Sequence, residues 1–165
     1  MAVTTPKPIP HRFPEELVSS TLFLLKRLGM AAKEQSFAEY AELGLHPYHH
    51  AILVVLDEGS RETQGSIADA LGYDRGQLVG LLDELEEGGL IVRRRDPADR
   101  RRHVVEMTAA GRKTLERLRK LSSRLEDEFL AALGPQERKQ LHTLLRSLAE
   151  QHLPHCKAAE SSSAA

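Results

Sequence analysis

The chain has 165 residues, 41% of them hydrophobic and 28% charged, with a formal net charge of −1, which is typical of a soluble globular protein of one domain. Its single cysteine excludes an intrachain disulfide framework and a cysteine-rich zinc site. The longest strictly apolar run, residues 51–56, is far shorter than the roughly 20 residues that a membrane helix needs. No secretory signal is visible at the start, so we expect a cytoplasmic protein with no membrane association.

The first 14 residues hold four of the eight prolines and should form an extended, proline-rich arm. Residues 15–43 then carry apolar side chains at helical spacing, and Gly44 supplies a stop. Pro47 marks where a second helix can begin, and Gly59 ends it.

The middle of the chain predicts two short helices joined by a tight turn. The first covers residues 64–71 and stops at Gly72. Asp74 caps the second, with Gln77 three residues on in a capping-box pattern. Gly88 and Gly89 end this second helix.

After these glycines the apolar residues no longer recur at helical spacing but alternate with polar residues. Residues 90–94 and 103–108 are predicted strands, and the intervening segment contains the turn-forming Asp96–Pro97 pair. A long helix is expected from about Ala109 to residue 133, and the last helix covers residues 137–153. Residues 154–165 should form a flexible tail.

This order of elements predicts a mainly α protein with a small β-hairpin wing. Residues 46–108 form a winged helix-turn-helix, in which the second short helix enters the major groove of DNA. The flanking segments 15–43 and 109–153 are predicted dimerisation helices, because their leucine stripes are more apolar than one small domain requires.

Charge is unevenly distributed along the chain. Residues 91–103 contain six arginines and two aspartates, a net charge of +4, so the remainder must sum to −5. A local cluster of positive charge on an otherwise acidic protein is suited to contact phosphates at one place. A solvated hairpin rim is the alternative interpretation.

The segment LGYDRGQLVGLLDELEEGGLIVRRRDPADRRRHVVEMTAAGR resembles the MarR family of bacterial transcriptional regulators. Its run from Asp96 to Arg101 is similar to the wing signature of that family, and the resemblance extends over residues 15–153. It implies a homodimer that binds a palindromic operator in double-stranded DNA, usually as a repressor released by a small molecule.

In the second short helix, the candidate base-reading residues are those of the first turn. Arginine can pair with guanine and glutamine with adenine, which selects Arg75, Gly76 and Gln77. Many family members carry Ser or Thr where Gly76 and Gln77 stand. Residues 74–87 have a net charge of −4, so only the first turn should contact DNA.

The face of this helix that is turned to the core comprises Leu78, Leu81, Leu82 and Leu85. Val79 is assigned to the core, with contact to a thymine methyl as the alternative, and Gly80 would let the helix approach DNA.

In the wing, the resemblance assigns Arg100 to the minor groove and Arg94, Arg95 and Arg102 to the DNA backbone. Asp99 and Arg101 should support the hairpin through an ion pair, with Asp99 as a solvated turn residue the alternative. Arg93 can face the protein body instead.

The resemblance also places a regulatory ligand near the start of the second helix. Aromatic rings and a cation there suit an aromatic carboxylate or a phenol, and the candidates are His11, Arg12, Tyr48, His49 and His50. Simple packing of the helix junction is the alternative. The histidines have no cysteine or acidic partner nearby in sequence, so no metal site or cofactor is predicted. The position of Cys156 does not match the reactive cysteine of peroxide-sensing relatives.

No enzyme signature is present, so we expect a binding protein and not an enzyme. The alternatives are a winged-helix module that binds protein, and a ligand-binding protein without an operator. A further alternative is an enzyme whose catalytic carboxylates leave no local sequence motif. A metal sensor fits the sequence less well than these alternatives.

Overall fold

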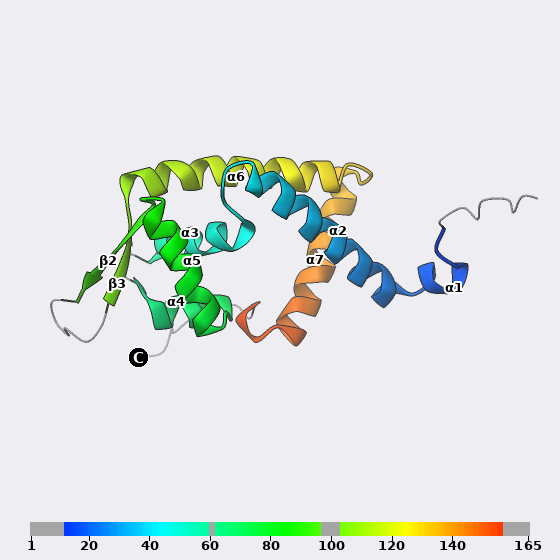
Figure 1. Ribbon diagram of the computed structural model, residues 1–165. Coiled ribbons are helices and arrows are strands. Elements are labelled where there is room, and N and C mark those ends of the chain that lie inside the picture. The colour runs from blue at the N-terminus through cyan, green and yellow to red at the C-terminus, as the bar shows by residue number, and fades with distance from the viewer. Residues whose placement is uncertain (1–11, 60–61, 97–102, 157–165) are drawn as a thin grey trace, which may run out of the picture. The chain divides into compact units, whose positions relative to one another are not determined.

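The computed structural model describes residues 12–59, 62–96 and 103–156 (Figure 1). The chain divides into two compact units, residues 1–35 and 36–165, and the boundary falls inside a helix. Within the described ranges, no helix is long and apolar enough to cross a membrane. The helices and strands in chain order are α1 Glu15–Val18, α2 Thr21–Ala41, α3 Pro47–Glu58, β1 Glu62–Thr63, α4 Gln64–Leu71, α5 Arg75–Glu87, β2 Ile91–Arg95, β3 His103–Met107, α6 Ala109–Phe129 and α7 Pro135–His152, followed by a 3-10 turn at Pro154–Cys156.

The segment predicted as one helix over residues 15–43 is two helices, so that prediction was wrong. The interruption lies at two serines whose side chains bond to nearby backbone. Ser19 Oγ donates to the Glu15 carbonyl oxygen (2.9 Å), and Ser20 Oγ accepts from the Phe23 amide (3.3 Å). Such local bonds compete with the regular helix pattern, so α1 ends and α2 begins at this point.

The core of the second unit is aliphatic and lies where α3, α4, α5 and α6 meet the sheet. Its buried side chains include the four leucines that the sequence assigned to the inner face of α5. That assignment is confirmed. The other apolar side chains that are almost completely buried are Ile52, Leu53, Ile67, Ile91, Val105, Leu115 and Leu118.

The wing is a three-stranded antiparallel sheet in the order β1–β3–β2. The predicted hairpin is present, in a register that runs from Ile91 opposite Met107 to Arg95 opposite His103. The third strand, β1, was not predicted, because two residues are too short to show a period. It pairs Glu62 with Val105.

A close contact joins the hairpin to α6. Thr108 caps α6 by accepting from the Gly111 amide (3.0 Å), and its hydroxyl donates to the Gly89 carbonyl oxygen (2.8 Å). A Cβ atom on Gly111 would clash with the Leu90 carbonyl oxygen and the Met107 side chain. The glycine therefore lets α6 begin directly against the strand that starts the wing.

Candidate functional site

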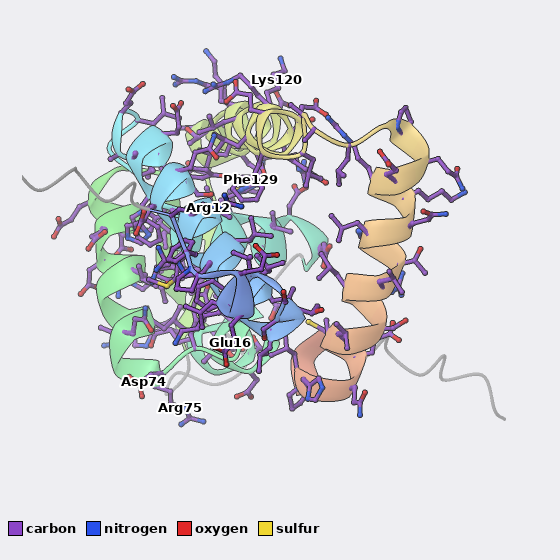
Figure 2. The ribbon with its side chains drawn as sticks, turned by 90° about the vertical axis from the view of Figure 1, so that its right-hand side faces the viewer. Arg12, Glu16, Asp74, Arg75, Lys120 and Phe129 are labelled. Carbon is purple, nitrogen blue, oxygen red and sulfur yellow. The ribbon has the colours of Figure 1, made fainter. Side chains whose placement is uncertain are left out.

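The first turn of α5 presents its side chains to solvent. Arg75, Gly76 and Gln77 are all exposed, and Arg75 extends away from the ribbon at the start of the helix (Figure 2). The Asp74 carboxylate accepts hydrogen bonds from the Gly76 amide (2.9 Å) and the Gln77 amide (3.1 Å). The predicted cap is therefore confirmed, and it occupies two amides that would otherwise be open to a phosphate. Recognition from this turn depends on the side chains of Arg75 and Gln77.

The exposed face of α5 continues one turn further. Val79 is 43% exposed, so its assignment to the core was wrong. It follows Arg75 and Gly76 at spacings of four and three, on the side away from the buried leucines. A Cβ atom on the adjacent Gly80 would meet nothing within 4 Å, so this part of the helix surface is flat and open.

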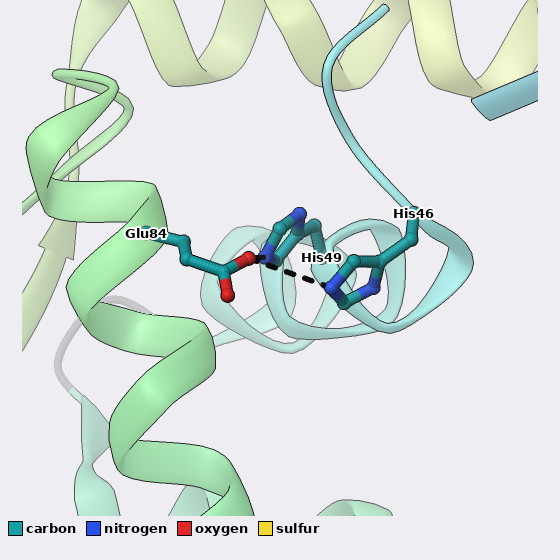
Figure 3. A group of neighbouring side chains, drawn as sticks. All are labelled: His46, His49 and Glu84. Atoms are coloured by element: carbon teal, nitrogen blue, oxygen red, sulfur yellow. Dashed lines mark ion pairs between the residues drawn. The ribbon is translucent and has the colours of Figure 1, made fainter. Parts of the chain in front are cut away.

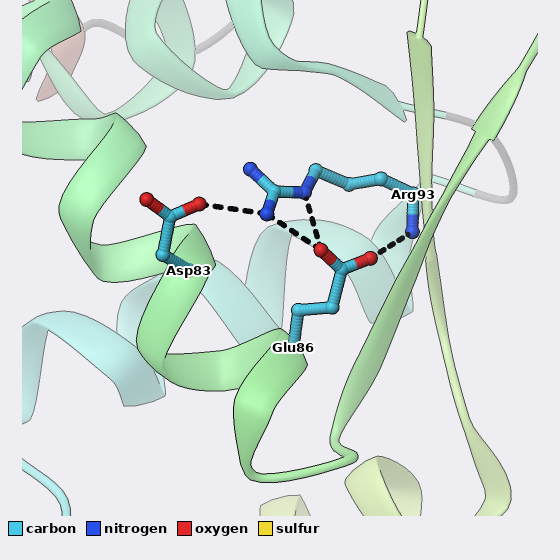
Figure 4. Close-up of polar contacts among 3 residues, drawn as sticks. All are labelled: Asp83, Glu86 and Arg93. Atoms are coloured by element: carbon cyan, nitrogen blue, oxygen red, sulfur yellow. Dashed lines mark hydrogen bonds and ion pairs between the residues drawn. The ribbon is translucent and has the colours of Figure 1, made fainter.

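Arg93 connects the wing to α5 (Figure 4). Its guanidinium donates from Nε to Glu86 Oε2 at 2.8 Å, and another nitrogen lies 2.7 Å from Asp83 Oδ1. The Arg93 amide also donates to Glu86 Oε1 at 2.8 Å. These hydrogen bonds lower the pKa of Glu86 and raise that of Arg93. The prediction that Arg93 faces the protein body is confirmed, and the contact compensates two of the acidic side chains of α5.

Two further wing arginines lie on β2 beyond this ion pair. Arg94 is 70% exposed, with its Nε atom 3.5 Å from Glu106 Oε2. Arg95 is exposed opposite His103, where the two strands leave the described part of the hairpin. The predictions for Asp99, Arg100, Arg101 and Arg102 fall outside the described residues.

A cluster of two histidines and a glutamate lies between α3 and α5 (Figure 3). His49 Nε2 is 3.0 Å from Glu84 Oε2, and His46 Nε2 is 3.5 Å from the same oxygen. The two imidazole rings stack with centroids 3.8 Å apart. His49 is only 2% exposed. Burial, assisted by the proximity of His46 and opposed by Glu84, lowers the pKa of His49 to about 4, so this imidazole is neutral at pH 7.

Sequence reasoning missed Glu84 as a neighbour of these histidines because it lies on a different helix. Helix periodicity alone places Glu84 on the solvent side of α5, one residue before the buried Leu85. Only the packing of the start of α3 against α5 brings the carboxylate to the imidazoles. No local spacing in the sequence could have indicated it.

The three candidate ligand residues at the start of α3 face different neighbours, and their role in ligand binding stays a prediction. Tyr48 packs edge-on against Phe37 and Tyr73, whereas His50 Nδ1 lies 2.7 Å from the Tyr40 hydroxyl. Successive helical residues point about 100° apart, so Tyr48, His49 and His50 face different neighbours. Burial, followed by the charge of Arg119, lowers the pKa of His50.

One candidate, His49, borders a cavity of about 240 Å³ in the second unit, which it lines together with Glu84, Arg117 and several apolar residues. The remaining two candidates belong to the first unit. Arg12 is exposed, 3.9 Å from Glu15, and His11 falls outside the described residues.

Comparisons with known proteins identify transcriptional regulators among the relatives of this chain. A profile of the MarR family matches residues 43–102. A putative transcriptional regulatory protein for the hcr operon of Thauera aromatica is 35% identical over 127 residues, which make up 76% of each chain. The solved structure of the transcriptional repressor CouR bound to a 23-mer DNA duplex is 37% identical, with a TM-score of 0.74, and the match covers 82% of this chain and 96% of that one. A probable transcriptional regulator from Pseudomonas aeruginosa is 32% identical, with a TM-score of 0.72 over 80% of this chain and 98% of its own.

Proposed function

The chain belongs to the MarR family of winged helix-turn-helix, DNA-binding transcriptional regulators, and from this premise we propose that it is a homodimeric repressor. In this proposal it binds a palindromic operator and is released by a small aromatic or phenolic ligand. The observation that carries the proposal is the exposed first turn of α5, tied to an arginine-bearing wing through Arg93.

Sequence recognition is assigned to α5. Arg75 and Gln77 stand at the exposed start of the helix, where their side chains can pair with guanine and adenine edges. The acidic end of the same helix would repel phosphates, but Arg93 compensates Asp83 and Glu86. The first turn of α5 can therefore approach DNA while Arg93 neutralises part of the negative charge at the other end of the helix.

The wing is assigned to the DNA backbone and the minor groove. Arg94 and Arg95 supply exposed cations on β2, and Arg102 would add a third backbone contact. Arg100 is proposed to insert into a narrow minor groove, where the negative potential attracts a guanidinium. Asp99 and Arg101 are proposed to support the hairpin. Each phosphate that the wing neutralises releases counterions, so this part of binding depends on salt.

Support for the homodimer comes from apolar side chains left in solvent. Within the described part of the protomer, α7 buries none of its side chains, and Leu144 is 65% exposed. Helix α2 likewise exposes a row of leucines, of which Leu22 is 77% exposed. Such stripes are expected to pack against a second copy. A twofold dimer would then place its α5 helices on half-sites about 10 bp apart.

Support for a ligand comes from the cavity beside α5. Arg117 and His49 offer hydrogen-bond donors suited to a carboxylate or phenolate, and Leu45 and Leu90 offer apolar walls. Glu84 of α5 also lines this space. A ligand that prefers one position of α5 would shift the population toward or away from the DNA-binding form.

The test is binding of the purified protein to the DNA that flanks its own gene. Fluorescence anisotropy with salt titration should give sequence-specific binding, and sedimentation should give one dimer per palindrome. Arg100→Ala should weaken binding and flatten the dependence of log K on log salt concentration. A monomer, or a protein that ignores every double-stranded fragment at low ionic strength, would contradict the proposal.

A further inference from the structure

We propose that His46, His49 and Glu84 form a binding site for a divalent transition-metal ion, with Zn²⁺ the best match. The site would join the start of α3 to the recognition helix α5. All three side chains offer a ligand atom, and these atoms lie within 4.8 Å of one another.

The separations of the ligand atoms suit a single small cation. Zinc bonds to imidazole nitrogen and carboxylate oxygen are about 2.0–2.2 Å long, so two ligand atoms of a tetrahedral site are about 3.3 Å apart. The distances from Glu84 Oε2 to the Nε2 atoms of His49 and His46 are 3.0 and 3.5 Å. Both values therefore lie close to the edge length of a zinc tetrahedron.

A second, independent observation points to a missing ligand. His49 is almost fully buried, yet within the described residues neither of its ring nitrogens has a hydrogen-bond partner of acceptable geometry. A buried polar atom without a partner costs free energy. The Nε2 atom lies 3.0 Å from Glu84 Oε2 (Figure 3), and a cation bound by both atoms would satisfy both groups.

The chemistry of the donor set selects the class of ion. Two imidazole nitrogens with one carboxylate oxygen favour zinc and similar transition metals over Mg²⁺ and Ca²⁺, which prefer oxygen ligands. The two stacked rings must rotate apart on binding, because the nitrogen lone pairs lie in the ring planes. The adjoining cavity, which His49 and Glu84 line, gives room for a fourth ligand such as water.

The placement of the site gives the ion a role in DNA binding, and this part rests on the proposed function. Glu84 lies on α5, the helix whose first turn carries Arg75 and Gln77, whereas the histidines belong to the start of α3. An ion that holds both elements would restrict the orientation of α5. Because it would bind the folded form, it would also stabilise the fold in proportion to its occupancy.

The first experiment titrates tag-free, chelator-treated protein with Co²⁺ and Zn²⁺ in the absence of DNA. We expect one ion per protomer, visible absorption bands of a tetrahedral Co²⁺ complex, and loss of those bands when Zn²⁺ displaces Co²⁺. Zn²⁺ should also raise the Tm of the wild-type protein. Less than one ion per protomer, or no visible bands, would overturn the site.

Matched variants distinguish the site from adventitious binding at surface histidines and carboxylates. Glu84→Gln and His46→Asn should each lower Zn²⁺ affinity by about tenfold or more and abolish the Tm increase. Glu87→Gln and His142→Asn, which remove exposed groups of the same kinds elsewhere, should bind Zn²⁺ as the wild type does. Glu84 is exposed, so Glu84→Gln should fold, which circular dichroism checks. Equal affinities in Glu84→Gln and wild type would overturn the assignment.

The effect on DNA is measured separately, so that the two proposals can fail independently. Operator affinity of the wild type should change when Zn²⁺ is added, whereas that of Glu84→Gln should not. If Zn²⁺ binds but leaves operator affinity unchanged, the coupling to α5 is overturned. If no DNA binds under any condition, the proposed function fails, and the metal titration still decides the site.

Discussion

At the scale of single residues, the contact of Arg93 with Glu86 and Asp83 neutralises part of the negative charge of α5, the helix proposed to approach DNA. The sequence shows five acidic side chains on residues 74–87 but not that two of them have an arginine partner on β2. From the sequence, Arg93 was expected to be able to face the protein body. The identity of its partners depends on how α5 packs against β2, which no spacing reveals.

Glu86→Gln should lower the free energy of unfolding at pH 7, because the carboxylate that accepts three hydrogen bonds from Arg93 is lost. These bonds lower the pKa of Glu86 in the folded state. The stabilisation is therefore complete above the unfolded-state pKa of about 4.3 and disappears as the pH falls through the lower folded-state value. Urea unfolding should show a larger difference from wild type at pH 7 than near pH 3, and Glu87→Gln serves as the control. A difference that does not shrink as the pH falls would contradict the assignment.

Arg75 and Arg95 should give different signatures when each is replaced by alanine. Loss of a base-reading arginine should cost about 1–3 kcal/mol at the cognate operator and relax the preference at one base pair. Loss of a phosphate-contacting arginine should weaken binding to all sequences alike and reduce the salt slope by about 1. Competition binding with single-base operator variants at several salt concentrations measures both effects. The roles would have to be exchanged if Arg95→Ala, and not Arg75→Ala, altered base preference.

At the scale of elements, periodicity predicted the main helices and the hairpin to within a few residues, because long apolar stripes follow the period of the structure they form. It failed where the signal is short or local. The break at Ser19 and Ser20 depends on two side-chain hydrogen bonds, and β1 has only two residues.

The junction between the wing and α6 allows a prediction about Gly111. A Cβ atom there would meet the backbone oxygen of Leu90, which cannot move aside as a flexible side chain can. Gly111→Ala should therefore lower the free energy of unfolding by about 1–3 kcal/mol through overpacking. Gly29→Ala is the control, because its Cβ atom would meet nothing within 4 Å, and it should instead stabilise α2 by up to about 1 kcal/mol. Chemical denaturation of both variants provides the measurement, and equal midpoints would contradict the packing argument.

At the scale of the whole molecule, the fold and family follow from the sequence because the order of elements and the wing segment are both distinctive. The candidate site follows only in part. Exposure of Arg75, Gly76 and Gln77 agrees with the prediction, whereas the approach of Glu84 to His46 and His49 requires the tertiary structure. Short-range patterns specify elements, but contacts between elements depend on how side chains from distant positions pack.

The exposed leucines of α7 lead to a prediction about assembly. Leu144 and Leu148 lie four residues apart on one face of the helix, and both are exposed in the protomer. Replacing both by glutamate would place two like charges per chain in the proposed interface, where burying an unpaired charge is strongly unfavourable. We expect the double variant to sediment as a monomer and to lose at least tenfold in operator affinity, because one α5 helix can then read only one half-site. Thr143→Glu adds a charge on another face of the same helix, about 100° around the axis from Leu144, and should leave both properties unchanged. A double variant that remains dimeric would show that α7 does not form the interface, whereas a monomer with full operator affinity would show that a single copy is enough to bind.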